Sequence, residues 1–521
     1  MKKILMGLTI LLTMLLAACS KNEITAKAII ILDSDKATLT ALYFDVEIVD
    51  AKNQITGKKE ARLYYKDGRL VPNKVLSIEE NSFSSSFAGL TEATEYTLHI
   101  YATIGRRMIS IGSIEAKTRS SEIIEIETVE QFLNMTMDYR ADYELMNPLD
   151  FTGVEFKTIF NLSSQPFQGT FNGNNHTLSN IKFSSITSAT SVFGFVSTGK
   201  IKDLNIENFQ VGTAEEPLST QTQSRVAVVA SRVSASDGLI SNVHIKDSEI
   251  HYSSSSSLTT TFAVQIGMIA GEISGTVEDV TVENGVISFE SKRQGRTLIG
   301  GAIGKLSDQG TIKRVSVDVD ITFKLNSTAT ARENYTALIG GIVGDSASGR
   351  IRGIEDVVQI GNIDIAELNY NTREGTSERT YSLFVGGIAG QSITQIKNAI
   401  FAGNIDFNHE ESEHDDEKII KKFYIGGLVG FYNSNRTIEG ALRFGSDKTI
   451  IINDDSVNSS YSQTIARKTG TISHQVAVYV EEHLLFNGDS KADDDLVDVI
   501  DNIDLFFTSD WIKEEFDKIK N

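Results

Sequence analysis

Three aspartates in the second half of the chain share one setting, because Asp320, Asp364 and Asp406 each lie between two apolar residues. Such alternation predicts strands whose apolar side chains face a core while the aspartates face solvent. If these strands are direct neighbours, the carboxylates lie about 5 Å apart, where like charges raise one another's pKa or recruit Ca²⁺. The three aspartates are therefore a candidate ligand or Ca²⁺ site. The alternative is three independent surface aspartates, because no basic or aromatic residues cluster beside them.

No other group of residues predicts catalysis or metal binding. His409 and His414 are five residues apart, whereas a helical zinc pair shares a face at a separation of four. The stretch around them is almost wholly charged through Lys418, which predicts a solvated loop. The sequence has no Gly-x-Ser-x-Gly motif, and its single cysteine lies near the N-terminus. We expect no catalytic residue, no bound metal and no cofactor, so that the chain is not an enzyme.

The N-terminus carries the pattern of an exported protein. Lys2 and Lys3 precede a short apolar run over residues 4–15, and Leu-Ala-Ala then leads to Cys19. The run is too short to span a membrane and is typical of a signal peptide over residues 1–18. The Leu-Ala-Ala-Cys ending resembles the bacterial lipobox, which implies lipidation of Cys19 and a lipid-anchored linker over residues 19–23. The alternative is an ordinary secretory signal with a chance cysteine.

Charge and cysteine content limit the cellular compartments and the classes of partner that fit this chain. The formal net charge is −20, which disfavours nucleic acid as a partner. One cysteine allows no internal disulfide, so hydrophobic burial and hydrogen bonding must hold the fold. With 521 residues, several domains are expected. Together with the lipobox, these features place the protein outside the cytoplasm, anchored by lipid to the bacterial membrane and exposed at the cell surface.

A glycine-rich phrase recurs along the second half of the chain. An apolar residue, Gly-Gly, two small apolar residues and Gly begin at Ile299, Ile339, Val385 and Ile425, spaced 40, 46 and 40 residues apart. Repetition at such a period indicates stacked units that bury their apolar faces against one another. Within the phrase, glycine suits positions where two backbones approach closely, and no side chain is expected to fit.

The start of this repeat region resembles a known bacterial architecture. Thr128 and Gln131 form a capping box for a short helix through about Met137, and residues 167–181 read F-x-G-x-F-x-G-N-x-H-x-L. This entry and the Gly-Gly phrases resemble right-handed parallel β-helices with GLUG-type repeats, which implies that fold over residues 122–450. The helix would cap one end. A capping region over 451–521, with helical spacing in its apolar residues 496–506, would cap the other.

Residues 24–118 predict a separate small all-β domain, because alternating runs are broken by turn signals. The stretch 87–102 resembles the E–F corner and F strand of fibronectin type III domains. Glu92 stands where that family usually has proline, and the strand-B tryptophan of the family is missing. The resemblance implies a β-sandwich in which the Tyr96 ring is buried and its hydroxyl hydrogen-bonds back to the corner. The whole chain is therefore expected to be all-β.

Three long polar insertions each follow the same strand of their repeat, over residues 324–337, 366–382 and 408–423. In a stacked solid they would emerge along one flank, where repeat proteins often bind their partners. The alternative is that they are longer outer strands or loops without a binding role.

Three classes of function remain. The first is a lipid-anchored, non-catalytic surface protein for adhesion or ligand binding, with a host protein or a glycan as partner, and this is the interpretation we adopt. The second is a carbohydrate-active enzyme, a polysaccharide lyase or hydrolase, that uses Asp320, Asp364 or Asp406 on the outer face of the β-helix. The third is a structural component of the envelope.

Overall fold

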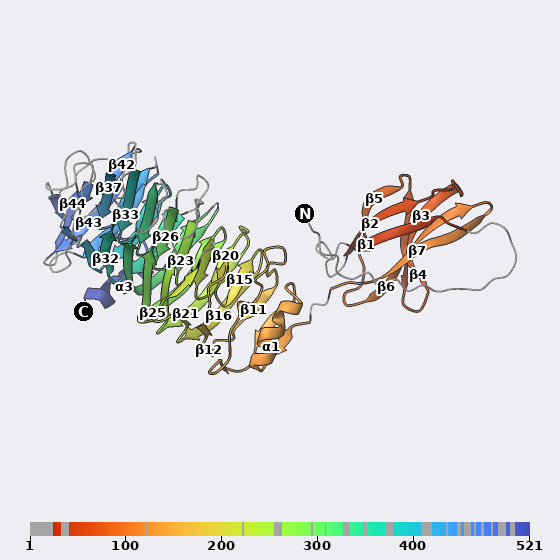
Figure 1. The fold of residues 1–521 in the computed structure, drawn as a ribbon, viewed down its shortest axis with the longest axis horizontal. Coiled ribbons are helices and arrows are strands. Elements are labelled where there is room, and N and C mark those ends of the chain that lie inside the picture. Colours follow the sequence, from red (N-terminus) through yellow and green to blue (C-terminus); the bar gives the residue numbers. More distant parts are fainter. Residues whose placement is uncertain are drawn as a thin grey trace. The chain divides into compact units, whose positions relative to one another are not determined.

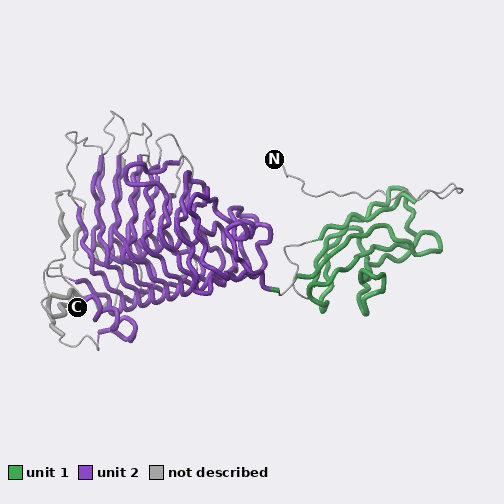
Figure 2. Tube along the Cα trace, turned by 90° about the horizontal axis from the view of Figure 1, so that it is seen from below, with its two compact units in different colours: residues 1–122 green, residues 123–521 purple. Residues whose placement is uncertain are grey.

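The structure is a computed structural model that divides into two compact units, residues 1–122 and 123–521 (Figure 2). The residues described are 24–32, 41–119, 122–220, 223–254, 263–292, 295–307, 309–326, 334–346, 353–369, 379–407, 419–433, 436–444, 450–452, 460–462, 465–469, 474–480, 483–487, 496–500 and 506–520.

The first unit is an antiparallel β-sandwich (Figure 1). One sheet has the strand order β1-β2-β5 and the other β4-β3-β6-β7, and apolar side chains from alternate positions of both sheets form one core. The strands are β1 (Lys27–Leu32), β2 (Ala41–Val49), β3 (Ile55–Tyr65), β4 (Leu70–Ile78), β5 (Ser82–Ala88), β6 (Glu95–Ile104) and β7 (Arg107–Lys117).

Tyr96, at the start of β6, confirms the predicted corner. Its side chain is buried, and its hydroxyl accepts a hydrogen bond from the backbone N–H of Thr91 at 3.0 Å. Leu98 and Ile100 on the same strand face the same core. The tyrosine thus joins strand β6 to the loop before it, as the sequence predicts.

The second unit is a parallel β-helix built from three sheets. Within the described residues, sheet 1 has 22 strands, and sheets 2 and 3 have eight each. Sheet 1 comprises β8 (Ile124–Ile126), β9 (Tyr143–Leu145), β10 (Leu149–Asp150), β11 (Thr170–Asn172), β12 (Thr177–Ser179), β13 (Lys182–Phe183), β16 (Lys200–Glu207), β17 (Gln210–Val211), β18 (Leu218–Thr220), β21 (Leu239–Lys246), β22 (Glu249–Ser254), β25 (Thr276–Ser291), β28 (Thr311–Asn326), β31 (Gly353–Gln359), β32 (Ile363–Asn369), β35 (Ile396–Phe401), β36 (Ile405–Phe407), β39 (Ile438–Phe444), β40 (Ile450–Ile452), β43 (His474–Val480), β44 (His483–Asn487) and β45 (Leu496–Ile500).

The other two sheets hold shorter strands. Sheet 2 comprises β14 (Ala189–Thr190), β19 (Ser224–Ala227), β23 (Ala263–Gly267), β26 (Gly295–Gly300), β29 (Tyr335–Gly340), β33 (Arg379–Gly386), β37 (Ile419–Gly426) and β41 (Ser460–Ser462). Sheet 3 comprises β15 (Phe193–Val196), β20 (Ala230–Val233), β24 (Ala270–Ile273), β27 (Ile303–Leu306), β30 (Val343–Ser346), β34 (Ala389–Ser392), β38 (Val429–Asn433) and β42 (Ile465–Thr469).

Each coil passes through the three sheets in turn, for example along β28, β29 and β30 before β31 opens the next coil (Figure 1). Equivalent strands of successive coils pair in parallel, as β29 does with β33 and β33 with β37. The apolar side chains that alternate along each strand fill one continuous core. The predicted fold class, a β-sandwich followed by a parallel β-helix, is therefore confirmed.

The recurring Gly-Gly phrase forms the corner between sheet 2 and sheet 3. In one coil, β29 ends at Gly340 and β30 begins at Val343, so Gly341 occupies the turn. A Cβ on Gly341 would lie 2.1 Å from the carbonyl oxygen of Gly387, and a Cβ on Gly387 would lie 2.2 Å from the Phe401 ring. Neither position has room for a side chain, which confirms the expectation from the sequence.

The two ends of the β-helix differ in how well the sequence predicts them. The helix α1 (Val129–Asn134), continued by η1 (Met135–Met137), begins at the predicted capping box of Thr128 and Gln131, and Phe132 is buried in the core. At the other end the parallel pairing continues beyond residue 450 through β43, and β44 and β45 then pair antiparallel. The helical spacing assigned to residues 496–506 is wrong for 496–500, which form strand β45.

The C-terminal helix α3 (Asp510–Lys520) covers part of the outer face of sheet 1. Phe506, Phe507, Ile512 and Phe516 pack on three outward-facing apolar residues of successive coils. Those three are Val358 on β31, Ile400 on β35 and Leu442 on β39, all fully buried. The helix thus packs on the flank of the solenoid, because that is where the outer face is apolar.

Candidate functional site

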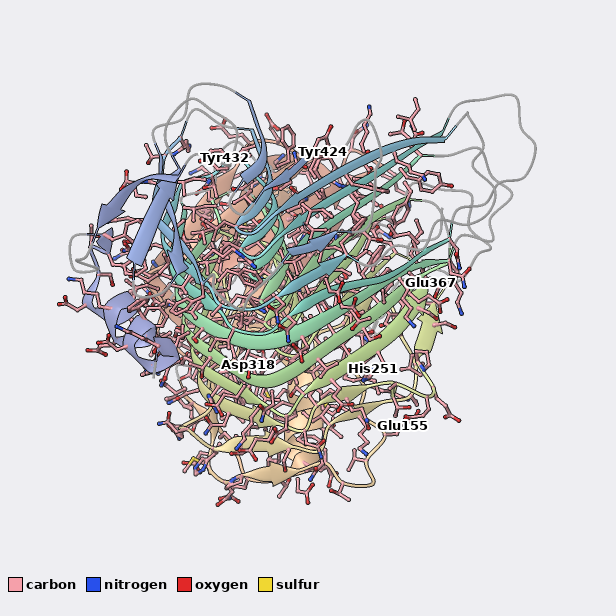
Figure 3. All side chains as sticks on the ribbon, turned by 90° about the vertical axis from the view of Figure 1, so that its left-hand side faces the viewer. Glu155, His251, Asp318, Glu367, Tyr424 and Tyr432 are labelled. Carbon is pink, nitrogen blue, oxygen red and sulfur yellow. The ribbon has the colours of Figure 1, made fainter. Side chains whose placement is uncertain are left out.

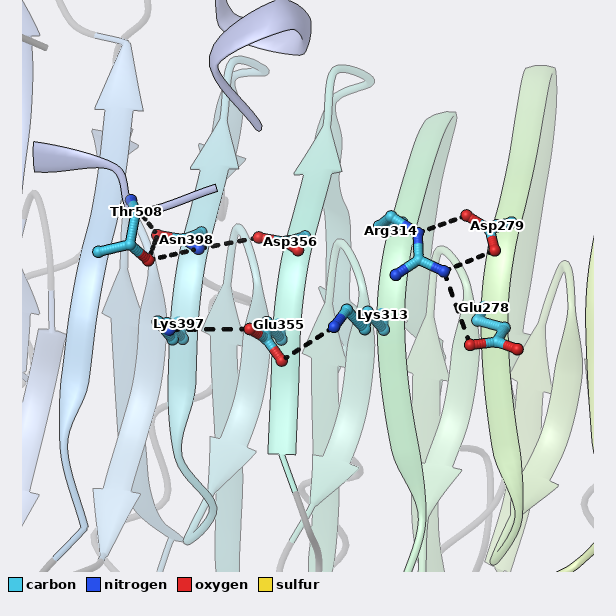
Figure 4. A network of polar contacts seen from close by, with 9 residues as sticks. All are labelled: Glu278, Asp279, Lys313, Arg314, Glu355, Asp356, Lys397, Asn398 and Thr508. Carbon is cyan, nitrogen blue, oxygen red and sulfur yellow. Dashed lines mark hydrogen bonds and ion pairs between the residues drawn. The ribbon is translucent and has the colours of Figure 1, made fainter. Parts of the chain in front are cut away.

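The outer face of sheet 1 carries ordered rows of polar side chains, one per coil (Figure 4). One row shares a left-handed backbone conformation, with φ between 49° and 63°, and most of its members are Asn, Asp or Gly, the residues that tolerate it. The row consists of Asp203, Asn242, Asp279, Arg314, Asp356, Asn398 and Gly440.

Hydrogen bonds and ion pairs join neighbouring members of these rows. Arg314 binds both carboxylate oxygens of Asp279, at 2.5 and 2.6 Å, and Asn398 donates to Asp356 at 2.8 Å (Figure 4). The Thr508 N–H donates to Asn398 Oδ1 at 3.2 Å, which ties the segment before α3 to the sheet. The outer face is therefore a preorganised polar surface beside α3.

The structure brings two of the three predicted aspartates together. Asp364 on β32 is in direct register with Asp406 on β36. Asp320 does not join them, because Thr322 is the β28 residue paired with Asp364. Asp320 instead accepts hydrogen bonds from Asn362, from the backbone N–H at 2.8 Å and from Nδ2 at 3.1 Å.

The row that contains Asp364 and Asp406 continues toward the N-terminus through Thr322, Ser288 and His251. The row therefore changes from carboxylates to hydroxyl groups and then to an imidazole. Figure 3, which views the solenoid from the side of its C-terminal coils, labels His251 and Glu367 on the long curved strands of sheet 1. The row therefore contains two carboxylates, Asp364 and Asp406, and the hydroxyl groups of Thr322 and Ser288 follow them.

Burial raises the pKa of Asp364 above its ordinary value of 3.8, and the negative charge of Asp406 raises it further, while Lys324 acts in the opposite direction. A carboxylic acid with a raised pKa in the folded state destabilises the fold once it is ionised. This loss of stability is absent below pH 3.8 and appears as the pH rises through the raised pKa of Asp364. At neutral pH, Asp364 is therefore expected to destabilise the coil that carries it.

We expect Asp364→Asn to stabilise the β-helix at pH 7 by about 0.2–1 kcal/mol, because it removes one of two like charges that lie directly opposite each other. The gain should vanish when the pH is lowered below 3.8, and thermal unfolding at several pH values measures it. The matched control is Asp320→Asn, which weakens the hydrogen bonds from Asn362 and should destabilise the protein at pH 7. Equal effects of both substitutions would contradict the observed register.

A groove beside α3 is a feature of this face that the sequence did not predict. Its cavity volume is about 760 Å³, and sheet 1 and α3 both contribute to its lining. Hydroxyl, carboxylate, ammonium, aliphatic and aromatic groups line it: Thr281, Val282, Glu283, Ser316, Asp318, Ile360, Ala402, Phe444, Glu515, Lys518, Ile519 and Lys520. We call it the α3 groove.

Two carboxylates from neighbouring coils lie in the α3 groove. Burial raises the pKa of Asp318, and the charges of Asp320 and Glu283 raise it further. Asp318 is partly buried on β28 (Figure 3), whereas Glu283 on β25 is exposed. Burial and the two neighbouring charges thus favour the protonated form of Asp318.

One row of residues contains the signal that could have located the groove. At this outward position, successive coils carry His244, Thr281 and Ser316 and then Val358 and Ile400. The change from polar to apolar marks where α3 packs, and the groove lies at that boundary. An alignment of the coils by register would have shown it.

The remaining predicted residues fall at the margins of the described chain. Cys19, His409 and His414 lie outside the described residues. The predicted bounds of the insertions are too wide, because both ends of 324–337 and of 366–382, and the last residue of 408–423, belong to strands. Phe423, for example, lies in β37 and is buried in the core. Searching the described ranges reveals no cluster of three or more His, Cys, Asp or Glu side chains suited to a metal ion.

Comparison with known proteins identifies no family for this chain. No protein-family profile and no curated protein matches the chain. Among solved structures, the chain is similar to pectate lyase PelI from Erwinia chrysanthemi, crystallised in complex with tetragalacturonic acid. That match has 10% sequence identity and a TM-score of 0.13, and it covers 76% of this chain and 99% of the other. In the described part of the chain, no helix is both long and apolar enough to cross a bilayer. The assignment of a parallel β-helix rests on the strand pairings themselves.

Proposed function

We propose that this protein is a lipid-anchored bacterial surface protein that binds a glycan without cleaving it. In this proposal Cys19 carries the lipid, and the sandwich is a fibronectin type III-like domain that precedes a GLUG-type β-helix along the chain. The strand orders β1-β2-β5 and β4-β3-β6-β7 and the buried Tyr96 corner support the fibronectin-like assignment. The Gly-Gly corners support the repeat assignment.

The α3 groove is the observation that carries the binding function. Aliphatic side chains such as Ile360 and Ile519 share its lining with the hydroxyls of Thr281 and Ser316 and with charged groups. A sugar presents apolar C–H patches and hydroxyl groups close together, so a lining that mixes these partners suits it. Ile360 is 39% exposed, which leaves an apolar surface available in the groove.

The test is a glycan array probed with residues 24–521, which contain every described residue. Ser316→Arg places a long side chain in the α3 groove and should abolish binding to any glycan that the wild type retains. Ser241→Arg is the matched control, because Ser241 is also a partly exposed serine on sheet 1 but does not line the groove. Failure of the wild type to bind any glycan would contradict the proposal and favour a protein partner or a structural role in the envelope.

A carbohydrate-active enzyme is the second candidate, and one observation favours it. Asp318, with its raised pKa, and Glu283 provide the acid and base that glycoside hydrolysis requires. This pair replaces the row of Asp320, Asp364 and Asp406 as the best candidate for catalysis, because Asp320 is out of register with the other two. Cleavage of a bound glycan that Asp318→Asn abolishes would establish this second candidate.

A further inference from the structure

A second pocket lies away from the α3 groove, on the outer surface of sheet 3. Outward-facing residues of three successive strands are in register there: Arg232 on β20, Glu272 on β24 and Lys305 on β27. Arg225 reaches the same point from β19 of sheet 2, where its Nε lies 3.0 Å from Glu272 Oε2. Side chains from both sheets therefore converge on one buried carboxylate.

The charges at this point do not balance. Glu272 is only 5% exposed, and it accepts from Arg225, Lys305 and the Ser307 hydroxyl at 3.0, 3.3 and 2.8 Å. These contacts already occupy both of its oxygens. Three cations thus surround Glu272. The row continues from Lys305 to Asp345, which pairs with Arg296 at 2.5 Å. Four cations and two anions leave an excess of two positive charges, on a chain whose net charge is −20.

Of the three cations, Arg232 makes the longest contact with Glu272. Its Nε lies 3.4 Å from Glu272 Oε2, and that buried nitrogen has no hydrogen-bond partner in the described part of the chain. The side chain is 38% exposed, so its guanidinium group is accessible. A planar guanidinium presents paired donors that match a carboxylate or a sulfate.

The space in front of these cations is large enough for more than an ion. The pocket has a volume of about 410 Å³, and it is lined chiefly by Arg232, Lys305 and four serines. Ser234, Ser274 and Ser307 follow the third strands of successive coils, and each donates its backbone N–H to the preceding coil. Their side chains thus form a row of hydroxyl groups beside the two cations, at the spacing of neighbouring strands, about 4.8 Å. We call this site the basic pocket.

We infer that the basic pocket binds an oxyanion, a carboxylate or a sulfate, carried by an acidic glycan. The oxyanion would accept from Arg232 and Lys305. The hydroxyls of Ser307 and Ser234, which donate to Glu272 and to the Val196 carbonyl, would accept from neighbouring sugar hydroxyls. Bringing an anion to this point neutralises part of the excess positive charge at a partly buried site, where electrostatic attraction is weakly screened. This inference does not depend on the α3 groove, which lies on a different sheet.

The structural alternative is that the three cations only stabilise Glu272. That alternative accounts for Arg225, which is largely enclosed and well placed on the carboxylate. It does not account for Arg232, which makes a poor contact with Glu272, or for the serine row beside it. Arg232 is therefore the residue whose substitution separates the two explanations.

The experiment measures binding of residues 24–521 to immobilised chondroitin sulfate, hyaluronan and dextran, with sodium sulfate as a free competitor. The wild type should bind at least one of the two acidic polymers and not neutral dextran. Arg232→Gln and Lys305→Gln should each weaken that binding about tenfold or more, the loss expected for one charge-assisted contact. Ser274→Ala, which changes no charge, should cause a smaller loss of binding. It provides a second test of the basic pocket if a charge substitution prevents folding.

Lys313→Gln is the matched control. Lys313 has the same charge and the same 38% side-chain exposure as Arg232, but it lies on sheet 1 and pairs with Glu355 at 3.8 Å. Its substitution should leave binding unchanged. Binding of neither acidic polymer, equal losses in Lys313→Gln and Arg232→Gln, or free sulfate bound as tightly as the polymers would each overturn the inference. Binding to the acidic polymers with wild-type strength in Arg232→Gln and Lys305→Gln would also overturn it.

Discussion

Gly387→Val is expected to destabilise the β-helix by about 3 kcal/mol or more. A Cβ at this position would lie 2.2 Å from two atoms of the Phe401 ring and 2.4 Å from the carbonyl oxygen of Gly427. Phe401 is fully buried, and Gly427 belongs to the next Gly-Gly corner, so neither neighbour can move without disturbing an adjacent coil. The two methyl groups of valine add further overlap.

Urea unfolding of residues 24–521, followed by circular dichroism, measures this loss. Ser241→Val is the control, because it introduces the same β-branched side chain at a partly exposed strand position and should be nearly neutral. Wild-type stability of the Gly387→Val protein would show that the Gly-Gly corner does not constrain the backbone as the structure indicates.

Cys19→Ser is expected to release the protein from the membrane completely. Cys19 is the only thiol of the chain and follows Leu-Ala-Ala, so no other residue can carry a thioether-linked lipid. Stable anchoring requires more than one acyl chain, and loss of the modified cysteine would remove them all. The measurement is membrane fractionation of expressing cells combined with metabolic labelling by a fatty acid.

The control for this experiment is Ser20→Ala, which changes the next residue and leaves the thiol in place. It should retain both the label and the membrane association. Unchanged membrane association of Cys19→Ser would contradict the lipoprotein assignment and leave an ordinary secretory signal as the explanation of the N-terminus.

The elements that the sequence predicts best are those set by local sterics. The Gly-Gly phrase locates the corner between sheets 2 and 3, because only glycine fits where stacked backbones approach within the reach of a Cβ. Tyr96 and the capping box of Thr128 and Gln131 are likewise short-range patterns with one geometric outcome. Such features can be read without knowing which coils are neighbours.

The register of the aspartates could not be read in the same way. Asp320 pairs with the position of Asn362, and Thr322 with Asp364, so matching Asp320 to Asp364 is wrong by two residues. Because side chains alternate with a period of two, a slip of two residues keeps every apolar side chain on the core side. The hydrophobic pattern therefore cannot distinguish the two alignments, and only backbone pairing does.

The prediction for the C-terminal region is wrong for a different reason. Residues 496–500 have apolar side chains at spacings that suit a helix, but a short apolar run does not distinguish a helix from a strand. The true helix, α3, is specified by Ile512 and Phe516, four residues apart and both buried. Because α3 packs on Val358 and Ile400, far away in the sequence, the α3 groove depends on contacts that no local pattern reveals.

Analysis of the glycan after incubation with the protein distinguishes binding without cleavage from catalysis. Residues 24–521 are mixed with a soluble polymer that the array identifies, and the products are separated by size. We expect the polymer to be retained on the protein and recovered at its original length. Shorter products with the wild type, and none with Asp318→Asn or Glu283→Gln, would contradict binding without cleavage and show that the α3 groove is an active site.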